Sequence, residues 1–123
     1  MKASFENIDS VFEFKGSWGI PSKCGLKRTT YNGKDVILVS ELYKDNPGTA
    51  ITQVTASLAM QICEKLNIDP KNLIYIEHNP EMGSKLSFYD EVFYSVSFEI
   101  VNGEFCKPAW KLLTTDEIKK YLK

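Results

Sequence analysis

The sequence is poor in cysteine, and its cysteines form no recognisable framework. Cys24, Cys63 and Cys106 are far apart, are odd in number and include no CxxC pair. This spacing argues against a zinc site with cysteine ligands and against a set of disulfides. We therefore expect three free thiols in a reducing cytoplasm.

The sequence also lacks an excess of charge of one sign. Fifteen basic residues stand against sixteen acidic ones, which gives a net charge of -1. Domains that bind nucleic acid usually carry a basic excess, so we expect no nucleic-acid partner. No apolar stretch approaches the roughly 20 residues that a membrane span needs. The first residues lack the apolar region of a signal peptide, and we expect a cytoplasmic protein without a membrane partner.

What is present is ordinary globular composition, with 43% hydrophobic and 25% charged residues in a chain of 123 residues. No linker or internal repeat divides the chain, so residues 1–123 are expected to form a single domain. Residues 1–23 are expected to be irregular, with a possible short strand at 11–14. Gly16, Gly19 and Pro21 interrupt any longer element there.

The remaining pattern predicts two strands, a helix, three strands and a short helix. In chain order these cover residues 24–31, 35–43, 50–66, 73–78, 91–101, 104–112 and 115–122. Asn32-Gly33 and Asn102-Gly103 suit tight hairpin turns, because both turn positions need a positive φ. Thr114 and Glu117 form a capping box for the last helix.

These elements predict an α+β fold. The sheet has about five mixed strands, with helices covering one face: one main helix and a short C-terminal helix. Pro108 marks the last strand as an edge strand or a bulge. In residues 91–101 the alternation assigns Phe93 to the more polar face, beside Ser95 and Ser97.

The main helix is predicted from an apolar stripe at helical spacing, formed by Ile51, Val54, Leu58, Ile62 and Leu66. Two starting points are open. Asn46 can cap the helix with Pro47 in its first turn, or Thr49 can cap it after a Pro-Gly turn. We favour Thr49, because a glycine inside the first turn is unfavourable.

The order strand, helix, strand over residues 35–78 implies two parallel strands if both lie in one sheet. Ligands in such units collect at the carboxyl ends of the strands. The polar residues expected to gather there are the candidate ligand-binding residues Glu41, Asp45, Asn46, Gly48, Thr49, Glu77, His78 and Asn79.

Several kinds of chemistry are open to this group. A helix N-terminus suits an anion, whereas carboxylates suit Mg²⁺, Mn²⁺ or a basic partner. The loop contains neither GxxxxGK[ST] nor GxGxxG, so no nucleotide and no other cofactor is expected. Neighbouring strand residues face opposite ways, which argues against an acid–base pair made of Glu77 and His78.

A purely structural interpretation is also open for each of these residues. Residues 45–48 can serve as a turn and a cap. His78 can bond to a loop carbonyl, and Glu41 and Glu77 can be solvated acids at the rim of the sheet. Aromatic residues in or beside turns are expected to close the rim of the core; they are Trp18, Tyr31, Tyr43, Phe88, Tyr89 and Trp110.

A nucleophile signature is missing from the sequence. The one thiol with basic neighbours is Cys24, which lies near Lys23, Lys27 and Arg28. Such neighbours can lower the pKa of a thiol, and a reactive Cys24 is the less favoured interpretation.

The segments "CGLKR", "VILVSEL-x-x-DNPGTAIT", "IDPKNLIYIEHNP" and "F-x-x-P-x-W" resemble a family of small, functionally uncharacterised bacterial proteins. The resemblance covers roughly residues 24–115 and implies no established activity. It singles out Asn46, Pro47, Gly48, Thr49, Thr52, Glu77, His78 and Pro80. Ala50 stands where the family pattern has Ser, and Asn79 where it has Tyr. The missing hydroxyl favours capping or binding over a serine nucleophile at that position.

Three hypotheses follow. The first is a non-catalytic binding or accessory domain that uses the 41–49/77–81 end of the sheet for a protein or small molecule. The second is a metal-dependent hydrolase of phosphoesters, in which Glu41, Asp45 and Glu77 hold the ion and His78 is a base or ligand. In the third, this polar group is structural and the function lies on a free sheet face or in the long 79–90 loop.

Overall fold

The computed structural model describes residues 10–40, 54–79 and 92–121. In chain order its elements are β1 (Ser10–Lys15), the 3-10 turn η1 (Ser17–Gly19), β2 (Pro21–Tyr31), β3 (Lys34–Ser40), α2 (Thr55–Leu66), the 3-10 turn η3 (Pro70–Asn72), β4 (Leu73–Asn79), β5 (Val92–Val101), β6 (Glu104–Leu112) and α4 (Thr115–Tyr121). None of the helices in these described ranges is long and apolar enough to cross a membrane.

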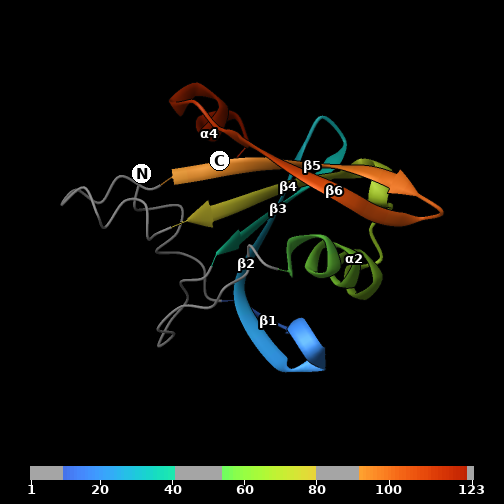
Figure 1. Ribbon diagram of the computed structural model, residues 1–123. Helices are drawn as coiled ribbons and strands as arrows, with labels where there is room; N and C mark the ends of the chain where they lie inside the picture. Colours follow the sequence, from blue (N-terminus) through green and yellow to red (C-terminus); the bar gives the residue numbers. More distant parts are fainter. Residues whose placement is uncertain (1–9, 41–53, 80–91, 122–123) are drawn as a thin grey trace.

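The described strands form one mixed sheet of six strands in the order β1-β2-β3-β4-β5-β6. β3 and β4 are parallel, and every other neighbouring pair is antiparallel. The α+β fold class and the parallel pair are therefore confirmed (Figure 1).

The possible short strand at 11–14 is confirmed, and the described part of residues 1–23 is less irregular than expected. β1 occupies Ser10–Lys15, and β2 begins at Pro21. Phe12 and Phe14 alternate into the core from β1, which explains why this short segment joins the sheet as a sixth strand. Residues 1–9 lie outside the described part.

Both hairpin turns have the predicted conformation. Asn32 and Gly33 have φ values of 50° and 76°, and Asn102 and Gly103 have values of 52° and 79°. Positive φ at both central positions is the requirement of the type I′ turn, which follows the twist of the strands it joins. The capping box is confirmed as well, because the Glu117 N–H donates to Thr114 Oγ1 at 3.2 Å and the Thr114 N–H donates to Glu117 Oε1 at 3.1 Å.

The main helix begins later than predicted. α2 starts at Thr55, preceded by Val54 with a non-helical φ of -125°. The predicted first turn and both proposed caps, Thr49 and Asn46, lie outside the described residues. The helix ends at Leu66, and the N–H of the following residue, Asn67, donates to the Cys63 carbonyl. The left-handed backbone of Asn67 turns the chain so that the Ile68 N–H reaches the same carbonyl at 2.9 Å.

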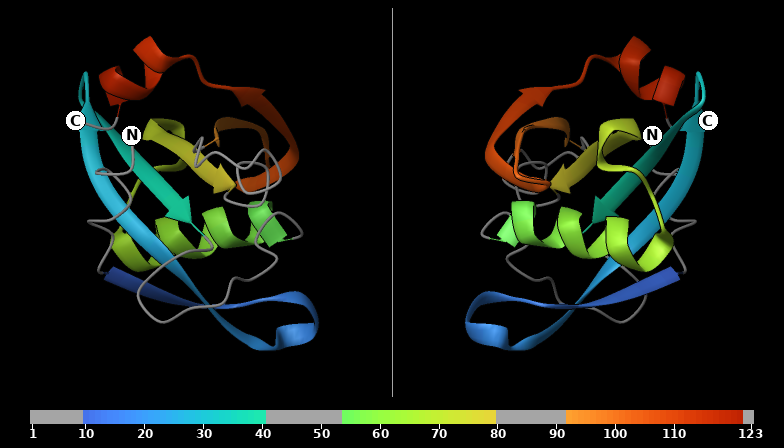
Figure 2. Two further views of the ribbon diagram at one scale, coloured as in Figure 1. Left: turned by 90° about the vertical axis from the view of Figure 1, so that its left-hand side faces the viewer. Right: turned by 90° about the vertical axis from the view of Figure 1, so that its right-hand side faces the viewer.

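The two helices cover opposite faces of the sheet, so the expectation that helices cover one face was wrong. α2 packs below the sheet and α4 above it in Figure 1, and Figure 2 shows the same layers from both sides. Ile37 and Val39 of β3 belong to the core between the sheet and α2, whereas Val36 and Leu38 belong to the core between the sheet and α4. A strand that is apolar on both faces needs cover on both faces.

Phe93 illustrates the same correction. It was assigned to the more polar face of β5 but is fully buried, in the α4-side core with Leu38, Ile76 and Ile118. The sequence alternation identified its face correctly, and the mistake was to expect that face to be solvated.

β6 is an edge strand, and it also contains a bulge. Ser97 pairs with Ala109 and Glu99 pairs with Cys106, so β6 has one extra residue between these pairs. Lys107, beside Pro108, takes up the irregularity with a φ of 49°. Both alternatives that were predicted for Pro108 are therefore present, because a proline cannot donate to a ladder and is tolerated at an edge or a bulge.

Candidate functional site

The carboxyl ends of β3 and β4 lie side by side, as the strand–helix–strand pattern predicted. Val39 pairs with Glu77, and Ser40 pairs with His78, in the parallel register. Of the eight candidate ligand-binding residues, Glu77 and His78 are described with their side chains and Asn79 with its backbone in β4. The other five, Glu41, Asp45, Asn46, Gly48 and Thr49, lie outside the described residues.

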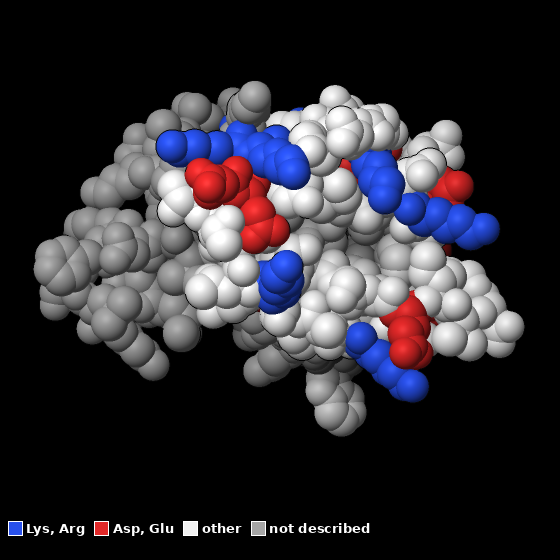
Figure 3. Space-filling view, turned by 90° about the horizontal axis from the view of Figure 1, so that it is seen from above, with Lys and Arg blue, Asp and Glu red and all other residues white. Residues whose placement is uncertain are grey.

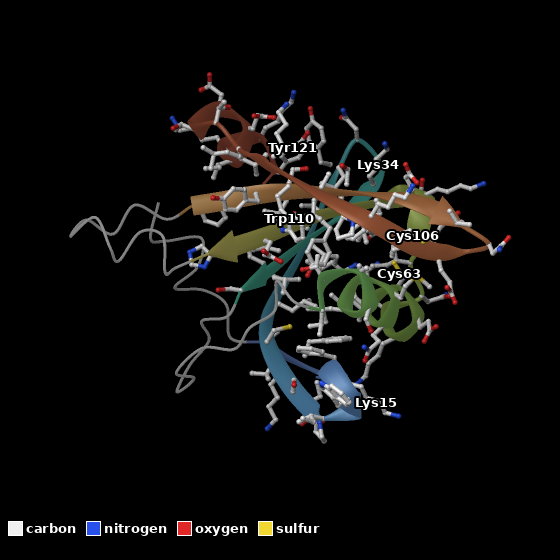
Figure 4. The ribbon with its side chains drawn as sticks, in the orientation of Figure 1. Lys15, Lys34, Cys63, Cys106, Trp110 and Tyr121 are labelled. Carbon is white, nitrogen blue, oxygen red and sulfur yellow. The ribbon has the colours of Figure 1, made fainter. Side chains whose placement is uncertain are left out.

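Glu77 is buried on the α2 side of the sheet, with 1% of its surface exposed. Its Oε1 accepts a hydrogen bond of 2.9 Å from the Thr55 hydroxyl at the start of α2. Its Oε2 accepts one of 3.1 Å from the indole N–H of Trp110 on β6, which is labelled in Figure 4. Of the interpretations left open for Glu77, the solvated rim position was wrong. Its carboxylate joins three elements, and these hydrogen bonds offset part of the cost of burying it.

Tyr75 lies two residues before Glu77 and therefore faces the same side of β4. Its hydroxyl is buried without a hydrogen-bond partner. Burial, followed by the nearby Glu77 charge and then by Cys24, raises the pKa of Tyr75 well above its usual value. Tyr75 therefore stays a neutral phenol. Among the described residues on the Glu77 side of the sheet, the Tyr75 hydroxyl is thus a buried polar group whose hydrogen-bonding capacity is not used.

His78 faces the α4 side of the sheet and is also 1% exposed. Its Nδ1 lies 2.9 Å from Ser40 Oγ on the neighbouring strand, and its ring lies 5.1 Å from the ring of Phe93. Burial lowers the pKa of His78 to about 3, so the imidazole is neutral near pH 7. Among the described residues, the hydrogen-bond partner of His78 is a strand hydroxyl, that of Ser40. The loops that could supply the carbonyl of the structural alternative lie outside the described residues.

The distance between Ser40 and His78 is that of a nucleophile and its general base, but their surroundings do not suit that chemistry. The Ser40 side chain is fully buried, so it cannot reach a substrate carbonyl in this conformation. A general base works best with a pKa near the working pH, and the pKa of His78 is several units lower. The pair forms a buried polar contact between the ends of β3 and β4.

Glu77 and His78 point to opposite faces of the sheet, as the sequence predicted. Glu77 contacts Thr55 and Trp110, whereas His78 contacts Ser40 and Phe93. Within the described ranges, no group of three or more His, Cys, Asp or Glu side chains could hold a metal ion.

The described cysteines are free thiols. Burial raises the pKa of Cys24 to about 12. Burial, with smaller contributions from Asp69, Asp35 and Glu64, raises the pKa of Cys63 to about 11. Both thiols stay protonated near neutral pH, so the interpretation of Cys24 as a reactive thiol was wrong: its basic sequence neighbours do not compensate for its burial.

Charged side chains do not gather into a field of one sign on the face seen from above in Figure 3. Lysine and arginine side chains are interspersed with acidic ones across the described part of that face. Among the described ion pairs, Arg28 with Asp35 has the shortest distance, 2.9 Å, and both side chains are partly exposed. This face does not resemble a nucleic-acid interface, which needs a continuous basic area.

Sequence reasoning missed three residues that contact the predicted site. Ser40 could have been found by aligning the ends of the two predicted parallel strands. Thr55 shares a helix face with Leu58, Ala59 and Ile62, and all of these are buried. Trp110 had no local signal, because the hydrogen bond to Glu77 joins residues that are 33 positions apart.

Comparison of the chain with protein-family models, with curated proteins and with solved structures gave no match.

Proposed function

We propose that this chain is a non-catalytic binding domain that receives a protein or a small molecule at the 41–49/77–81 end of the sheet. The observation that supports the proposal is the parallel pairing of β3 and β4, whose last residues include the buried polar side chains Ser40, Glu77 and His78. Carboxyl ends of adjacent parallel strands are the usual place for ligands in such units.

The proposed binding residues are those at and after the carboxyl ends of the two strands: Glu41, Asp45, Asn46, Gly48, Thr49 and Asn79. Glu77 and His78, in β4, support them from the two faces of the sheet. Glu77 and His78 are engaged with Thr55, Trp110 and Ser40, so their proposed role is to hold the strand ends in place. A rigid base is what a binding site requires, because ordering its residues on binding would lower the affinity.

We propose that the domain is not catalytic because of the burial and protonation of its described thiol, hydroxyl and imidazole groups. The thiols of Cys24 and Cys63 are protonated, Ser40 is buried, and the pKa of His78 is too low for a general base near neutral pH. The alternative, a metal-dependent phosphoester hydrolase, has less support because Glu77 and His78 face opposite sides of β4 and cannot bind the same ion.

The test is a thermal-shift panel of divalent cations, nucleotides, phosphate and sugars, followed by titration of any ligand that raises the midpoint. A ligand that binds the native state alone, present at a hundred times its dissociation constant, stabilises the protein by about 2.7 kcal/mol. The variant is Asp45→Ala. Glu104→Ala is the matched control, because β6 begins at Glu104 beside Val101, at the far end of β5 from Val92 and Asn79.

A ligand-induced rise of the unfolding midpoint that disappears in Asp45→Ala and persists in Glu104→Ala supports the proposed site. Calorimetric titration with Mg²⁺, Mn²⁺ and Zn²⁺ is expected to give no stoichiometric binding. Turnover of phosphoester, ester or peptide substrates that is lost in Glu77→Gln would contradict the non-catalytic assignment.

A further inference from the structure

The tip of the β1–β2 hairpin, residues 16–20, presents an apolar surface to solvent. Trp18 is 97% exposed and Ile20 is 59% exposed, and Trp18 is the most exposed large hydrophobic side chain of the described residues. The hairpin lies at the bottom of Figures 1 and 2, beside α2 and at the opposite end of the molecule from α4. Trp18 was expected to close the rim of the core, and that expectation was wrong.

The tip is shaped by specific backbone contacts. The Gly16 N–H donates to the Ile20 carbonyl at 2.8 Å, and the Gly19 N–H donates to the Gly16 carbonyl at 3.2 Å. A Cβ on Gly16 would lie 2.8 Å from Ser22 Oγ, so a larger residue at this position would require the Ser22 side chain to move. These contacts hold Trp18 at a φ of 64° and ψ of 19°, a left-handed conformation that is disfavoured for a tryptophan. Such strain persists where the surrounding structure imposes it, and it is often associated with function.

The stem of the hairpin is attached to α2. The Lys15 N–H donates to Gln61 Oε1 at 2.8 Å, and Gln61 Nε2 donates to the Lys15 carbonyl at 2.9 Å. The Gln61 amide thus pairs with the outer edge of β1 as a neighbouring strand would. The backbone of the tip is therefore held in place before binding, which reduces the conformational entropy lost when a partner binds Trp18.

The side chains around the tip indicate the chemistry of its partner. Trp18 and Ile20 suit an apolar pocket, and Trp is one of the residues most enriched at the centres of protein interfaces. Lys15 and Lys23 lie in the stem, and the one stem carboxylate, Glu13, pairs with Lys23 at 3.7 Å. The stem is therefore basic overall, which complements a pocket with an acidic rim.

We propose that Trp18 and Ile20 form an anchor that inserts into an apolar pocket with an acidic rim on a partner protein. A protein pocket suits this tip better than a bilayer does, because stable attachment to a membrane needs a second signal such as a polybasic segment. The stem offers two lysines, one of them paired, in a chain with a net charge of -1. The anchor belongs to the β1–β2 hairpin, whereas the proposed function uses the carboxyl ends of β3 and β4, so the two proposals can fail separately.

The experiment places the photo-crosslinking amino acid p-benzoylphenylalanine at position 18 of the full chain, expressed in its native host. The control position is Lys34, the exposed first residue of β3. It pairs with Tyr31 at one end of β2, whereas Lys15 pairs with Pro21 at the other end, and both lysines are labelled in Figure 4. The protein crosslinked at position 18 is identified, purified and titrated with the wild type and with Trp18→Ala, Trp18→Phe and Leu112→Ala. Leu112 is the control for removing an exposed apolar side chain elsewhere.

The expected result is an adduct at position 18 that does not form at position 34. Trp18→Ala should lower the affinity of the purified pair by about thirtyfold or more, the loss typical of a central aromatic residue. Trp18→Phe should lose less, and Leu112→Ala should bind as the wild type does. Added salt should weaken binding, because the stem carries the excess positive charge of Lys15 toward the acidic rim of the pocket.

Two outcomes of this experiment would overturn the proposal. One is the lack of an adduct specific to position 18, and the other is equal affinity of Trp18→Ala and the wild type for the crosslinked protein. A blue shift of Trp18 emission on vesicles of phosphatidylcholine and phosphatidylserine, measured in a Trp110→Phe background, would assign the tip to a bilayer. A dimer in sedimentation that Trp18→Ala abolishes would assign it to a second copy of the chain.

Discussion

Glu77 and His78 are neighbours in the chain whose side chains are buried in two different layers of the protein. Consecutive residues of β4 face opposite sides of the sheet, so one side chain meets α2 and β6 while the other meets Ser40 and Phe93. At the scale of single residues, each of these buried polar groups depends on partners from other elements. Two predictions follow from these partners.

Trp110 stabilises the buried carboxylate of Glu77 through its indole N–H. Trp110→Phe keeps an aromatic ring but removes this donor, so the free energy of unfolding should fall by about 1.5–3 kcal/mol, the range for a hydrogen bond to a charged group. Urea denaturation measures the change. In a Glu77→Leu background the same substitution should have a much smaller effect, and an undiminished effect there would mean that the ring packing is what matters.

His78 should make stability depend on pH. The unfolded histidine binds a proton near pH 6.5, whereas in the folded state burial lowers the pKa to about 3. Between these values the unfolded state holds more protons, so the contribution of His78 to stability falls as the pH falls, by up to about 1.4 kcal/mol per pH unit. Above pH 6.5 the contribution is constant.

The measurement for His78 is urea denaturation of the wild type and of His78→Asn at several pH values. Carboxylates affect both proteins alike, so the difference between them isolates the histidine. The two free energies should run parallel above pH 7 and converge below pH 6. Parallel curves over the whole range would show that His78 can be protonated in the folded state at little cost.

At the scale of elements, both edges of the sheet carry features that hinder pairing with another strand. On β1 the Gln61 amide occupies the backbone N–H and carbonyl of Lys15. On β6 the bulge at Lys107, together with Pro108 and Lys111, interrupts the free edge. Proline, lysine and bulges at edges are known means of preventing unwanted pairing between sheets. Edge pairing is therefore a poor explanation for the exposed side chains of Trp110 and Leu112.

The bulge predicts an unequal response to the same substitution at two positions of β6. Lys107→Val should lower the free energy of unfolding by about 1–2 kcal/mol more than Lys111→Val, because a β-branched residue is strained at a φ of 49°. The ion pair between Lys107 and Glu99 is exposed and contributes little to this difference. Thermal or urea unfolding of both variants measures it, and Lys107→Asn, which tolerates positive φ, should remain close to the wild type. Equal losses for the two valine variants would contradict the strained position.

At the scale of the whole molecule, the sheet separates two cores of unequal size. The larger core lies between the sheet and the twelve-residue helix α2, and the smaller core lies between the sheet and the seven-residue helix α4. Helices as short as α4 are marginal on their own, so its packing on the sheet keeps it folded. The aromatic pair of Tyr31 and Tyr121, with centroids 5.1 Å apart, helps to attach it.

Because the two cores are separate, substitutions in one core and in the other should have additive effects on the free energy of unfolding. Ile62→Val, beneath α2, should lower the free energy of unfolding by about 0.5–1.5 kcal/mol, and Ile118→Ala, beneath α4, by about 2–5 kcal/mol. Because the sheet lies between the two sites, the double variant should equal the sum within about 0.5 kcal/mol in urea denaturation. A coupling above about 1 kcal/mol would mean that the two cores act as one packing unit.

The sequence by itself determined the features that depend on neighbouring residues. The Asn-Gly turns, the capping box, the strand alternation, the position of the edge proline and the opposite orientation of Glu77 and His78 all follow from local backbone geometry. Periodicity also determined the α+β class and the parallel pair β3–β4, because a strand, a helix and a strand in that order have few ways to form one sheet.

Only the tertiary structure decided which faces are covered and which polar groups meet. The position of α4 opposite α2, the burial of Phe93, the bonds from Thr55 and Trp110 to Glu77, and the exposure of Trp18 depend on elements that are distant in the chain. Local propensity contains no information on such contacts. They arise because both apolar faces of a central strand must be buried, and because a buried carboxylate must find donors wherever the fold brings them.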